Sequence, residues 1–523
     1  MSEIFRKVSQ SLLRFLVSTR MIVVGLFLAA NFSALAAISL APPHDEWLGM
    51  YINGKKVGYA HTAVTPIVHD GTPAYQEVSY SILNLSMFGQ NVQQEANSTT
   101  LSDPKHQPLH QVIDVSSNGS KLHVVATYDY KAHKIQCQLG VGAGATTKSI
   151  NIPDGADLAG DPELATNGHK LQIGQNFDVY VLDPTTIALD KIHVEITGRQ
   201  EVVNESGKRV PSFVVKEATP VGESIEWVTE TGETIREELS LGPVKLTTTS
   251  ETRKHATDSA FVSPSVSSAP SPAYVPSGDF AVATSVRPDK AIESPRTTKA
   301  LKVVLSGVPN KKLVIDDDRQ RVLVPPTGDA GPFAATLQIT AETVDRTSAP
   351  SLPIKDAALS RYISKAPYLD TDSAELRSTA VRICGSEKNS YSAALLIRDW
   401  VHQNMTPDAS IGVPRSATDV FTRRRGVCRD YATLFAALAR CAGIPTRLCA
   451  GVVFGEVSST PAFYYHAWDE IWVGKWVAVD PTLYDASLGI DYVDATHIKL
   501  AQGDVTDMFD AVTVIGRLKI SLP

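Results

Sequence analysis

Two hydrophobic patterns divide this chain. In the first, short runs alternate apolar and polar positions, as in residues 122–128, 177–182 and 192–196. Turn-forming pairs such as Asn53-Gly54 separate these runs. A period of two puts the apolar side chains on one face of a strand, and Asn-Gly pairs favour two-residue hairpin turns. The pattern predicts an antiparallel β domain over residues 43–255, folded as a curved sheet or half-barrel, with its first hairpin at Asn53-Gly54.

In the second pattern, which begins after residue 350, apolar residues recur at helical spacing. One such stripe comprises Ala393, Leu396, Ile397, Trp400 and Val401. A later helix begins at Cys428 and is expected to end at Gly443 and Pro445. Strand-like runs follow at residues 446–454, 463–473 and 475–480. Helices followed by strands predict an α+β fold for residues 350–523, with helices packed on an antiparallel sheet.

A segment of different composition separates the two patterns. Residues 259–277 are rich in Ser, Pro and Ala and lack the apolar side chains that form a core. This composition is typical of a linker, which we place at residues 256–279. Strand-like runs at residues 301–305 and 334–339 predict a small β module over residues 280–345.

Composition narrows the classes of partner. The chain has 523 residues, of which 43% are hydrophobic and 20% charged, and its formal net charge is −7. Lys and Arg are scattered, apart from residues 423–425, which we interpret as a solvated helix end. This negative net charge, with scattered basic residues, excludes a nucleic-acid-binding surface, so we expect no nucleic-acid partner.

The N-terminus has the pattern of an export signal. Basic residues precede an apolar run that begins at Met21, and small residues follow with a cleavage-like site after Ala36. We therefore predict a signal peptide over residues 1–36 and an exported chain, periplasmic or extracellular. The apolar run from Met21 to Leu40 is also just long enough to span a bilayer, so an uncleaved membrane anchor is the alternative.

One of the five cysteines stands out by its position. Cys428 directly follows Gly426-Val427 at the start of a predicted helix, where free backbone N–H groups and the helix dipole stabilise a thiolate. Cys441 is thirteen residues further on and faces another side of the helix. We expect Cys441 and Cys449 to fill core positions or to pair with each other.

A histidine and a carboxylate follow this cysteine. His466 lies in a predicted strand, and Asp480 ends the next one, where its carboxylate can orient an imidazole. Asp430 and Asp469 are rival orienting groups, although Asp469 points to the opposite strand face from His466. A metal site built from the cysteines and His466 conflicts with the helix geometry. We therefore predict no metal and no organic cofactor.

The strand register decides whether His466 and Asp480 share a face. Pairing Trp472 with Trp476 leaves residues 473–475 as a three-residue loop containing Gly474. In that register Asp480 lies opposite Trp468, one step along the same face from His466. We expect the Asp480 carboxylate within about 4 Å of the His466 ring, and the other ring nitrogen toward the Cys428 sulfur.

The set of motifs resembles a known family. Gly426-Val427-Cys428, the helix that follows it, His466-Ala467-Trp468 and the segment from Trp476 to Thr482 are similar to the bacterial transglutaminase-like superfamily of papain-like Cys-His-Asp enzymes. The resemblance covers roughly residues 390–485, and the β-rich region before it is more weakly similar to segments that precede such domains. It implies a triad of Cys428 as nucleophile, His466 as base and acid, and Asp480 as orienting group. It leaves the oxyanion-hole side chain open, with Trp400 and Asn404 as candidates.

The sequence therefore predicts an exported thiol enzyme that acts on peptide or protein amides through an acyl-enzyme. Water or an amine would resolve this intermediate, giving hydrolysis or transamidation. The substrate would be a protein or peptide. The alternative is a cell-envelope binding or scaffolding protein with a catalytically silent domain of the same fold.

Overall fold

The computed structural model describes residues 43–140, 145–160, 170–258 and 279–523. The predicted export signal and nearly all of the predicted linker lie outside these residues. None of the helices in the described ranges combines the length and apolar composition needed to cross a bilayer.

The N-terminal half forms a 15-stranded sheet within the described residues. Its strands, in chain order, are β1 (His44–Ile52), β2 (Lys55–His69), β3 (Thr72–Met87), β4 (Gln90–Ser102), β5 (Pro108–Ser117), β6 (Ser120–Asp129), β7 (Lys134–Leu139), β8 (Thr146–Asn151), β9 (Asp157–Ala159), β10 (Asn176–Asp183), β11 (Ala188–Val203), β12 (Arg209–Ala218), β13 (Glu223–Val228), β14 (Thr234–Leu241) and β15 (Val244–Ser250).

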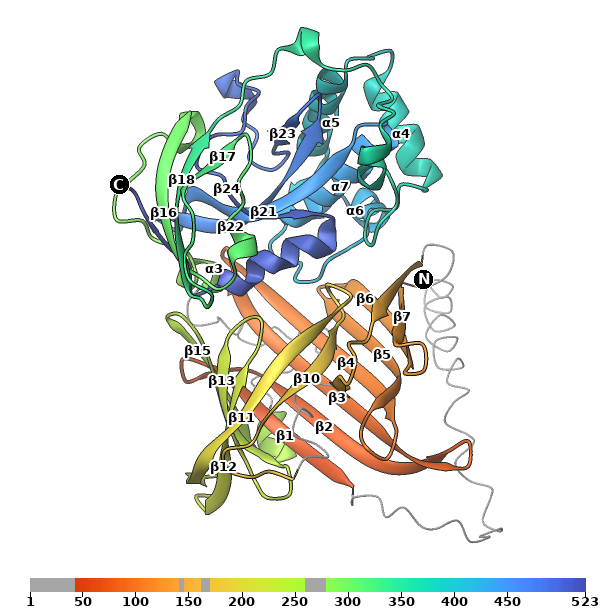
Figure 1. The fold of residues 1–523 in the computed structure, drawn as a ribbon, viewed down its shortest axis with the longest axis vertical. Coiled ribbons are helices and arrows are strands. Elements are labelled where there is room, and N and C mark those ends of the chain that lie inside the picture. Colours follow the sequence, from red (N-terminus) through yellow and green to blue (C-terminus); the bar gives the residue numbers. More distant parts are fainter. Residues whose placement is uncertain (1–42, 141–144, 161–169, 259–278) are drawn as a thin grey trace, which may run out of the picture. The chain divides into compact units, whose positions relative to one another are not determined.

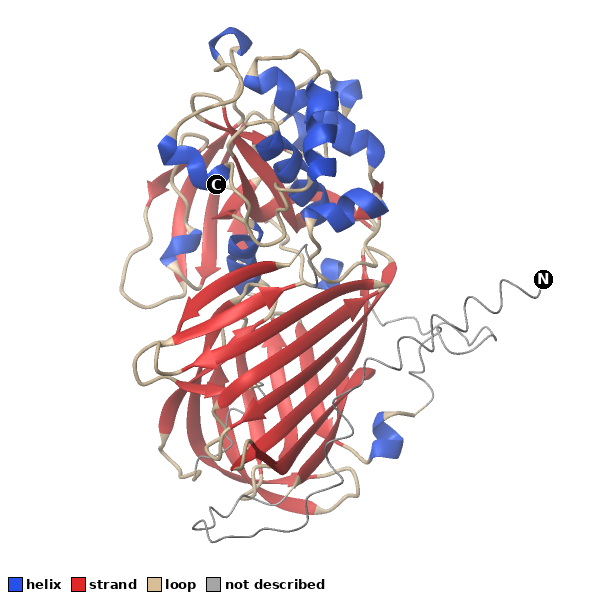
Figure 2. Cartoon of the chain, turned by 90° about the vertical axis from the view of Figure 1, so that its right-hand side faces the viewer, coloured by secondary structure: helices blue, strands red, loops and turns tan. Residues whose placement is uncertain are grey.

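The chain enters this sheet at its centre. From β1 it forms successive hairpins outward to β8, then enters the opposite edge at β9 and returns inward to β15, which pairs with β1. All neighbours are antiparallel except β9 and β10. Figure 2 shows the strands as one broad, curved surface. The predicted antiparallel β fold is confirmed for this part of the chain.

The local sequence explains the hairpin turns of this sheet and which of its two faces is buried. Asn53 and Gly54 have φ angles of 47° and 79°, which Asn and Gly tolerate best, and they close the β1–β2 hairpin as predicted. Along β6 the apolar residues Leu122, Val124 and Ala126 are buried, whereas Lys121 and Thr127 between such positions are exposed. Alternation therefore gives the sheet one core-facing side.

The C-terminal half combines helices with two four-stranded sheets among the described residues. One four-stranded sheet has the order β17-β18-β16-β25, and the other has the order β23-β22-β21-β24. Two further short strands, β19 and β20, form a parallel pair. The strands are β16 (Ala300–Val308), β17 (Gln320–Val324), β18 (Phe333–Thr340), β19 (Thr406–Pro407), β20 (Arg425–Gly426), β21 (Thr446–Val457), β22 (Thr460–Trp472), β23 (Trp476–Val479), β24 (Ile498–Gly503) and β25 (Lys519–Ser521).

Four α-helices accompany these sheets, and two shorter ones, α2 (Arg253–Ala256) and α3 (Phe280–Ala283), precede them in the described chain. The four are α4 (Ala374–Cys384), α5 (Ser390–Asn404), α6 (Ala417–Arg423) and α7 (Cys428–Cys441). The 3₁₀ helices are η4 (Pro295–Thr297), η5 (Lys311–Leu313), η6 (Arg346–Ser348), η7 (Ala357–Tyr362), η8 (Ala486–Leu488) and η9 (Val505–Val514).

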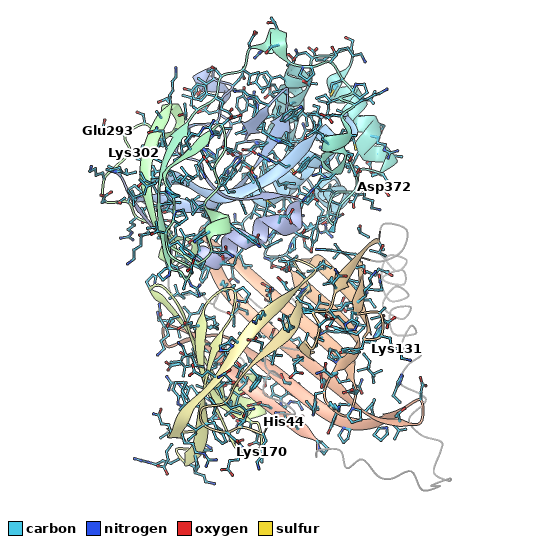
Figure 3. All side chains as sticks on the ribbon, viewed as in Figure 1. His44, Lys131, Lys170, Glu293, Lys302 and Asp372 are labelled. Atoms are coloured by element: carbon cyan, nitrogen blue, oxygen red, sulfur yellow. The ribbon has the colours of Figure 1, made fainter. Side chains whose placement is uncertain are left out.

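Helix α7 is the centre of this half. Every residue from Asp430 to Arg440 is buried, and Figure 1 shows the helix beside β21 and β22. Helices packed on an antiparallel sheet confirm the predicted α+β fold of the C-terminal region. Charged side chains outside the core, such as Lys131 and Lys302, point away from the ribbon in Figure 3.

The β22–β23 hairpin has the predicted register. Trp472 pairs with Trp476, and the three-residue loop between them contains Gly474 with a φ angle of 96°. The two indole rings meet edge to face with centroids 5.6 Å apart. The ladder ends at Asp469 opposite Val479, so Asp480 is the first residue beyond it.

Candidate active site

Cys428 is the first residue of α7, at the helix end that the sequence predicted. The helix start is held by Asp430, whose carboxylate accepts the backbone N–H of Val427 at 3.0 Å. Arg415 Nη2 lies 3.0 Å from the same carboxylate, and both side chains are about 1% exposed. Asp430 therefore caps α7 and pairs with Arg415. These two contacts engage the carboxylate that the sequence presents as a rival to Asp480 for orienting His466.

His466 and Asp480 meet as the register requires. His466 Nε2 lies 2.9 Å from Asp480 Oδ2, within the expected limit. The other carboxylate oxygen, Oδ1, accepts the backbone N–H groups of Thr482 at 2.7 Å and Leu483 at 3.2 Å. An ionised carboxylate only accepts hydrogen bonds, so the His466 proton sits on Nε2 and Nδ1 is left to serve the thiol.

Electrostatics favour an ion pair between Cys428 and His466. Burial opposes the Cys428 thiolate, but a hydrogen bond and charge from His466, the backbone N–H of Ala467 and the charge of Arg429 lower the thiol pKa below its usual range. Burial likewise opposes the imidazolium, yet Asp480 and Cys428 raise the pKa of His466 to about 10. Both shifts stabilise the charged form of each partner.

Asp480 stays ionised despite its burial. Burial alone would raise its pKa, but His466 and then His497 hold the pKa of this carboxyl well below its usual range. Asp469 behaves in the opposite way. It is fully buried, neither carboxyl oxygen has a hydrogen-bond partner in the described structure, and burial followed by repulsion from Asp480 raises its pKa far above the usual value.

The remaining sequence candidates lie elsewhere. Trp400 packs on Phe421 and Arg424, and Asn404 donates to the Trp400 carbonyl at 2.8 Å, so both side chains are engaged along α5 and α6. Cys441 donates its thiol to the Thr371 carbonyl at 3.6 Å. Cys449 is buried in a cluster with Trp468, Ala478 and Val493. Both cysteines are free, so they fill core positions and form no disulfide.

His497 is the polar residue that sequence reasoning missed. It is 2% exposed, and its Nε2 lies 3.1 Å from Asp480 Oδ2. It directly precedes β24, which is brought beside β21 by long-range pairing. The signal in the sequence is a histidine before the short segment Ile498-Lys499-Leu500-Ala501, which is compatible with a strand but does not reveal the strand's neighbour.

The donor atoms of His466, Asp480 and His497 lie within 4.8 Å of one another, close enough to consider a metal. Zinc with bonds of about 2.0–2.1 Å separates tetrahedral ligand atoms by about 3.3 Å. The observed separations from Asp480 Oδ2, 2.9 and 3.1 Å, are hydrogen-bond distances. Both Nε2 atoms carry the protons that a metal would have to replace, so the described geometry fits hydrogen bonding better than ligation.

Gly426, two residues before Cys428, is required by close packing. A Cβ on Gly426 would collide with the Asp430 carboxylate and lie 2.6 Å from Arg415 Nη2. We expect Gly426→Ala to lower the free energy of unfolding by about 1–3 kcal/mol, because the added methyl displaces a buried ion pair. Urea titration measures this change. Gly455→Ala is the matched control, since nothing lies within 4 Å of that position. Equal losses in both variants would contradict the packing argument.

Comparison with known sequences identifies this region. A sequence profile described as the transglutaminase-like superfamily matches residues 377–481, the segment that carries Cys428, His466 and Asp480. These residues form a transglutaminase-like domain. The resemblance read from the motifs is thereby confirmed for this part of the chain.

Relatives match only parts of the protein. An uncharacterized protein of Mycobacterium leprae is 32% identical over 20% of this chain and 43% of its own length. A protein-glutamine gamma-glutamyltransferase of Pseudomonas aeruginosa is 41% identical over 12% of this chain and 11% of its own length. The match thus spans less than half of either relative. The solved structure of a candidate cysteine protease from Cytophaga hutchinsonii aligns with 43% of this chain and 81% of that chain, at 23% identity and a TM-score of 0.30.

Proposed function

We propose that this protein is an exported thiol enzyme that acts on peptide or protein amides through a Cys428 acyl-enzyme. One observation carries the proposal: Cys428 at the start of α7 hydrogen-bonds His466, which hydrogen-bonds the ionised Asp480. This order of nucleophile, base and orienting carboxylate is what acyl transfer from an amide needs.

The chemistry proceeds in two halves. The Cys428 thiolate attacks the carbonyl carbon, and the tetrahedral intermediate collapses as His466 gives its proton to the departing amine. Backbone N–H groups in the first turn of α7 are available to the oxyanion. The resulting thioester is then attacked by water or by an amine, whose proton passes to His466. Water yields hydrolysis, and an amine yields transamidation.

The substrate class is supported from two directions. A thiolate paired with an imidazolium is suited to acyl groups whose leaving group must be protonated, as amides require. The Pseudomonas aeruginosa relative is named for glutamyl transfer from protein glutamine, which makes a glutamine carboxamide the first substrate to test. Export rests on the basic, apolar and small-residue pattern of residues 1–36.

The test offers one substrate and reads several outcomes. Full-length protein is incubated with casein and a fluorescent primary amine, and covalent dye, peptide fragments and released ammonia are measured. Covalent dye indicates transamidation, fragments indicate proteolysis, and ammonia without dye indicates deamidation.

Two variants make this test decisive. Cys428→Ala should abolish whichever signal the wild type gives, whereas Cys384→Ala should keep it, because Cys384 lies in α4 and burial raises the pKa of its thiol. A signal that survives Cys428→Ala, or a wild type silent in all three assays, contradicts the proposal. The silent result would favour a binding or scaffolding protein.

A further inference from the structure

A second histidine shares the orienting carboxylate. His497 Nε2 lies 3.1 Å from Asp480 Oδ2, the same oxygen that His466 Nε2 approaches at 2.9 Å. Because this oxygen can only accept, His497 also carries its proton on Nε2. Asp480 therefore receives four hydrogen bonds, two from imidazoles at Oδ2 and two from backbone N–H groups at Oδ1.

The His497 ring is itself held on several sides. Trp468 meets it edge to face at a centroid distance of 5.3 Å, and Arg319 donates to the His497 backbone carbonyl at 2.9 Å. Its far nitrogen, Nδ1, lies 3.4 Å from Asp494 Oδ1. Asp494 is in turn paired with Arg296 at 3.1 Å. A ring fixed in this way has little freedom to leave Asp480.

These contacts place a row of polar groups behind the thiol. From Cys428 it runs through His466, Asp480 and His497 to Asp494 and ends at Arg296. In the described structure, the groups that act on the Cys428 thiol are His466, Ala467 and Arg429, and the second half of the row is not among them. Its influence on the thiol passes through the Asp480 carboxylate, which His497 donates to, and through the His466 ring, which the His497 ring meets edge to face at 5.6 Å.

We propose that His497 is a positioning residue of the active site. Its Nε2–H fixes the Asp480 carboxylate so that Oδ2 remains directed at His466, and the carboxylate then holds the His466 tautomer that serves Cys428. The inference rests on the proposed function, since it assigns His497 a part in activating the same thiol.

Charged and titratable groups lie on each side of His497, and they must be named before a pH profile of its variants can be interpreted. His466 and Asp480 face His497 from the catalytic side, and Asp494 faces it from the other. Arg319 approaches through the His497 backbone carbonyl, and Arg296 lies beyond Asp494. Asp469 lies beyond Asp480, and burial followed by repulsion from Asp480 raises the pKa of its carboxyl. A change at His497 alone leaves all of these groups in place.

The test measures the rate of Cys428 alkylation by iodoacetamide across pH in the full-length protein. His497→Phe keeps an aromatic ring against Trp468 but removes the donor. We expect its rate at pH 6 to fall roughly 10- to 100-fold, the effect of losing one hydrogen bond to a charged group, and the midpoint of the pH profile to move upward. His497→Gln, whose terminal amide restores an N–H near the Nε2 position, should recover most of the rate.

Controls separate positioning from a loss of structure. His106→Phe removes a comparable part-buried contact, Nδ1 to Glu77 Oε1 at 3.0 Å, which joins the β4–β5 loop to β3, and should leave the profile unchanged. If His497→Phe only lowers the melting temperature and keeps the wild-type midpoint, or if His497→Gln recovers nothing while remaining folded, the inference is wrong. A wild type without reactivity at pH 6 would instead overturn the proposed function.

Discussion

At pH 6, iodoacetamide is expected to alkylate Cys428 about 100-fold or more faster than any of the other four cysteines, because only a thiolate reacts and only this thiol has a lowered pKa. Burial raises the pKa of Cys137 and of Cys441 to about 11. It raises that of Cys449 well above its usual value, and that of Cys384 to a smaller degree. Mass spectrometry of peptides from partly alkylated protein gives all five rates in one experiment.

The same pair predicts the shape of the pH profile. The Cys428 pKa is depressed, so the thiolate is present above that pKa and is lost as the pH falls through it. The His466 pKa is raised to about 10, so the imidazolium is present below this value and is lost as the pH rises through it. Acyl transfer needs both charges and should fall on both sides, whereas alkylation needs only the thiolate and should persist above pH 10.

Two substitutions make the alkylation result specific. Cys428→Ser should remove the fast phase, and Cys384→Ser should leave it intact, since Cys384 is a partly exposed thiol in α4 whose pKa is raised by burial. Fast labelling at pH 6 that survives Cys428→Ser would move the nucleophile to another cysteine. Uniform slow labelling of the wild type would mean that the ion pair does not form.

Local rules were enough to predict the parts of the site that are close in sequence. The β22–β23 register follows from side-chain parity and a loop containing Gly474, and both depend on a few neighbouring residues. The helix start at Cys428 follows from Gly426 and from the apolar spacing behind it. These features brought His466 to Asp480 in the sequence analysis, and the structure has the same contact.

Long-range pairing is what the sequence did not reveal. His497 reaches Asp480 only because β24 pairs with β21, and no turn or periodicity links those strands. In the same way, β25 joins β16 from the far end of the chain, and β15 closes against β1. The Arg415 pair with Asp430 is a further case, because a sequence shows charges but not which of them are buried together.

Asp480→Asn is expected to lower acyl transfer roughly 10³- to 10⁴-fold, as loss of the orienting carboxylate does in serine-protease triads. If the amide oxygen keeps the Thr482 and Leu483 N–H groups, the amide nitrogen faces both imidazoles and donates where it must accept. His466 then turns its Nδ1–H toward Cys428 and can no longer take a proton there. The opposite amide orientation instead leaves the two backbone donors unpaired.

The matched control for this change is Asp469→Asn. Asp469 is buried on the same hairpin, and burial raises its pKa far above the usual value, which favours the neutral carboxyl that an amide resembles. Its alkylation profile and melting temperature should therefore stay near those of the wild type. Asp480→Asn should lose the reactive thiolate at pH 6 while circular dichroism still reports a folded protein. Comparable alkylation profiles for the two variants would contradict an orienting role for Asp480, because a neutral amide would then serve as well as the carboxylate.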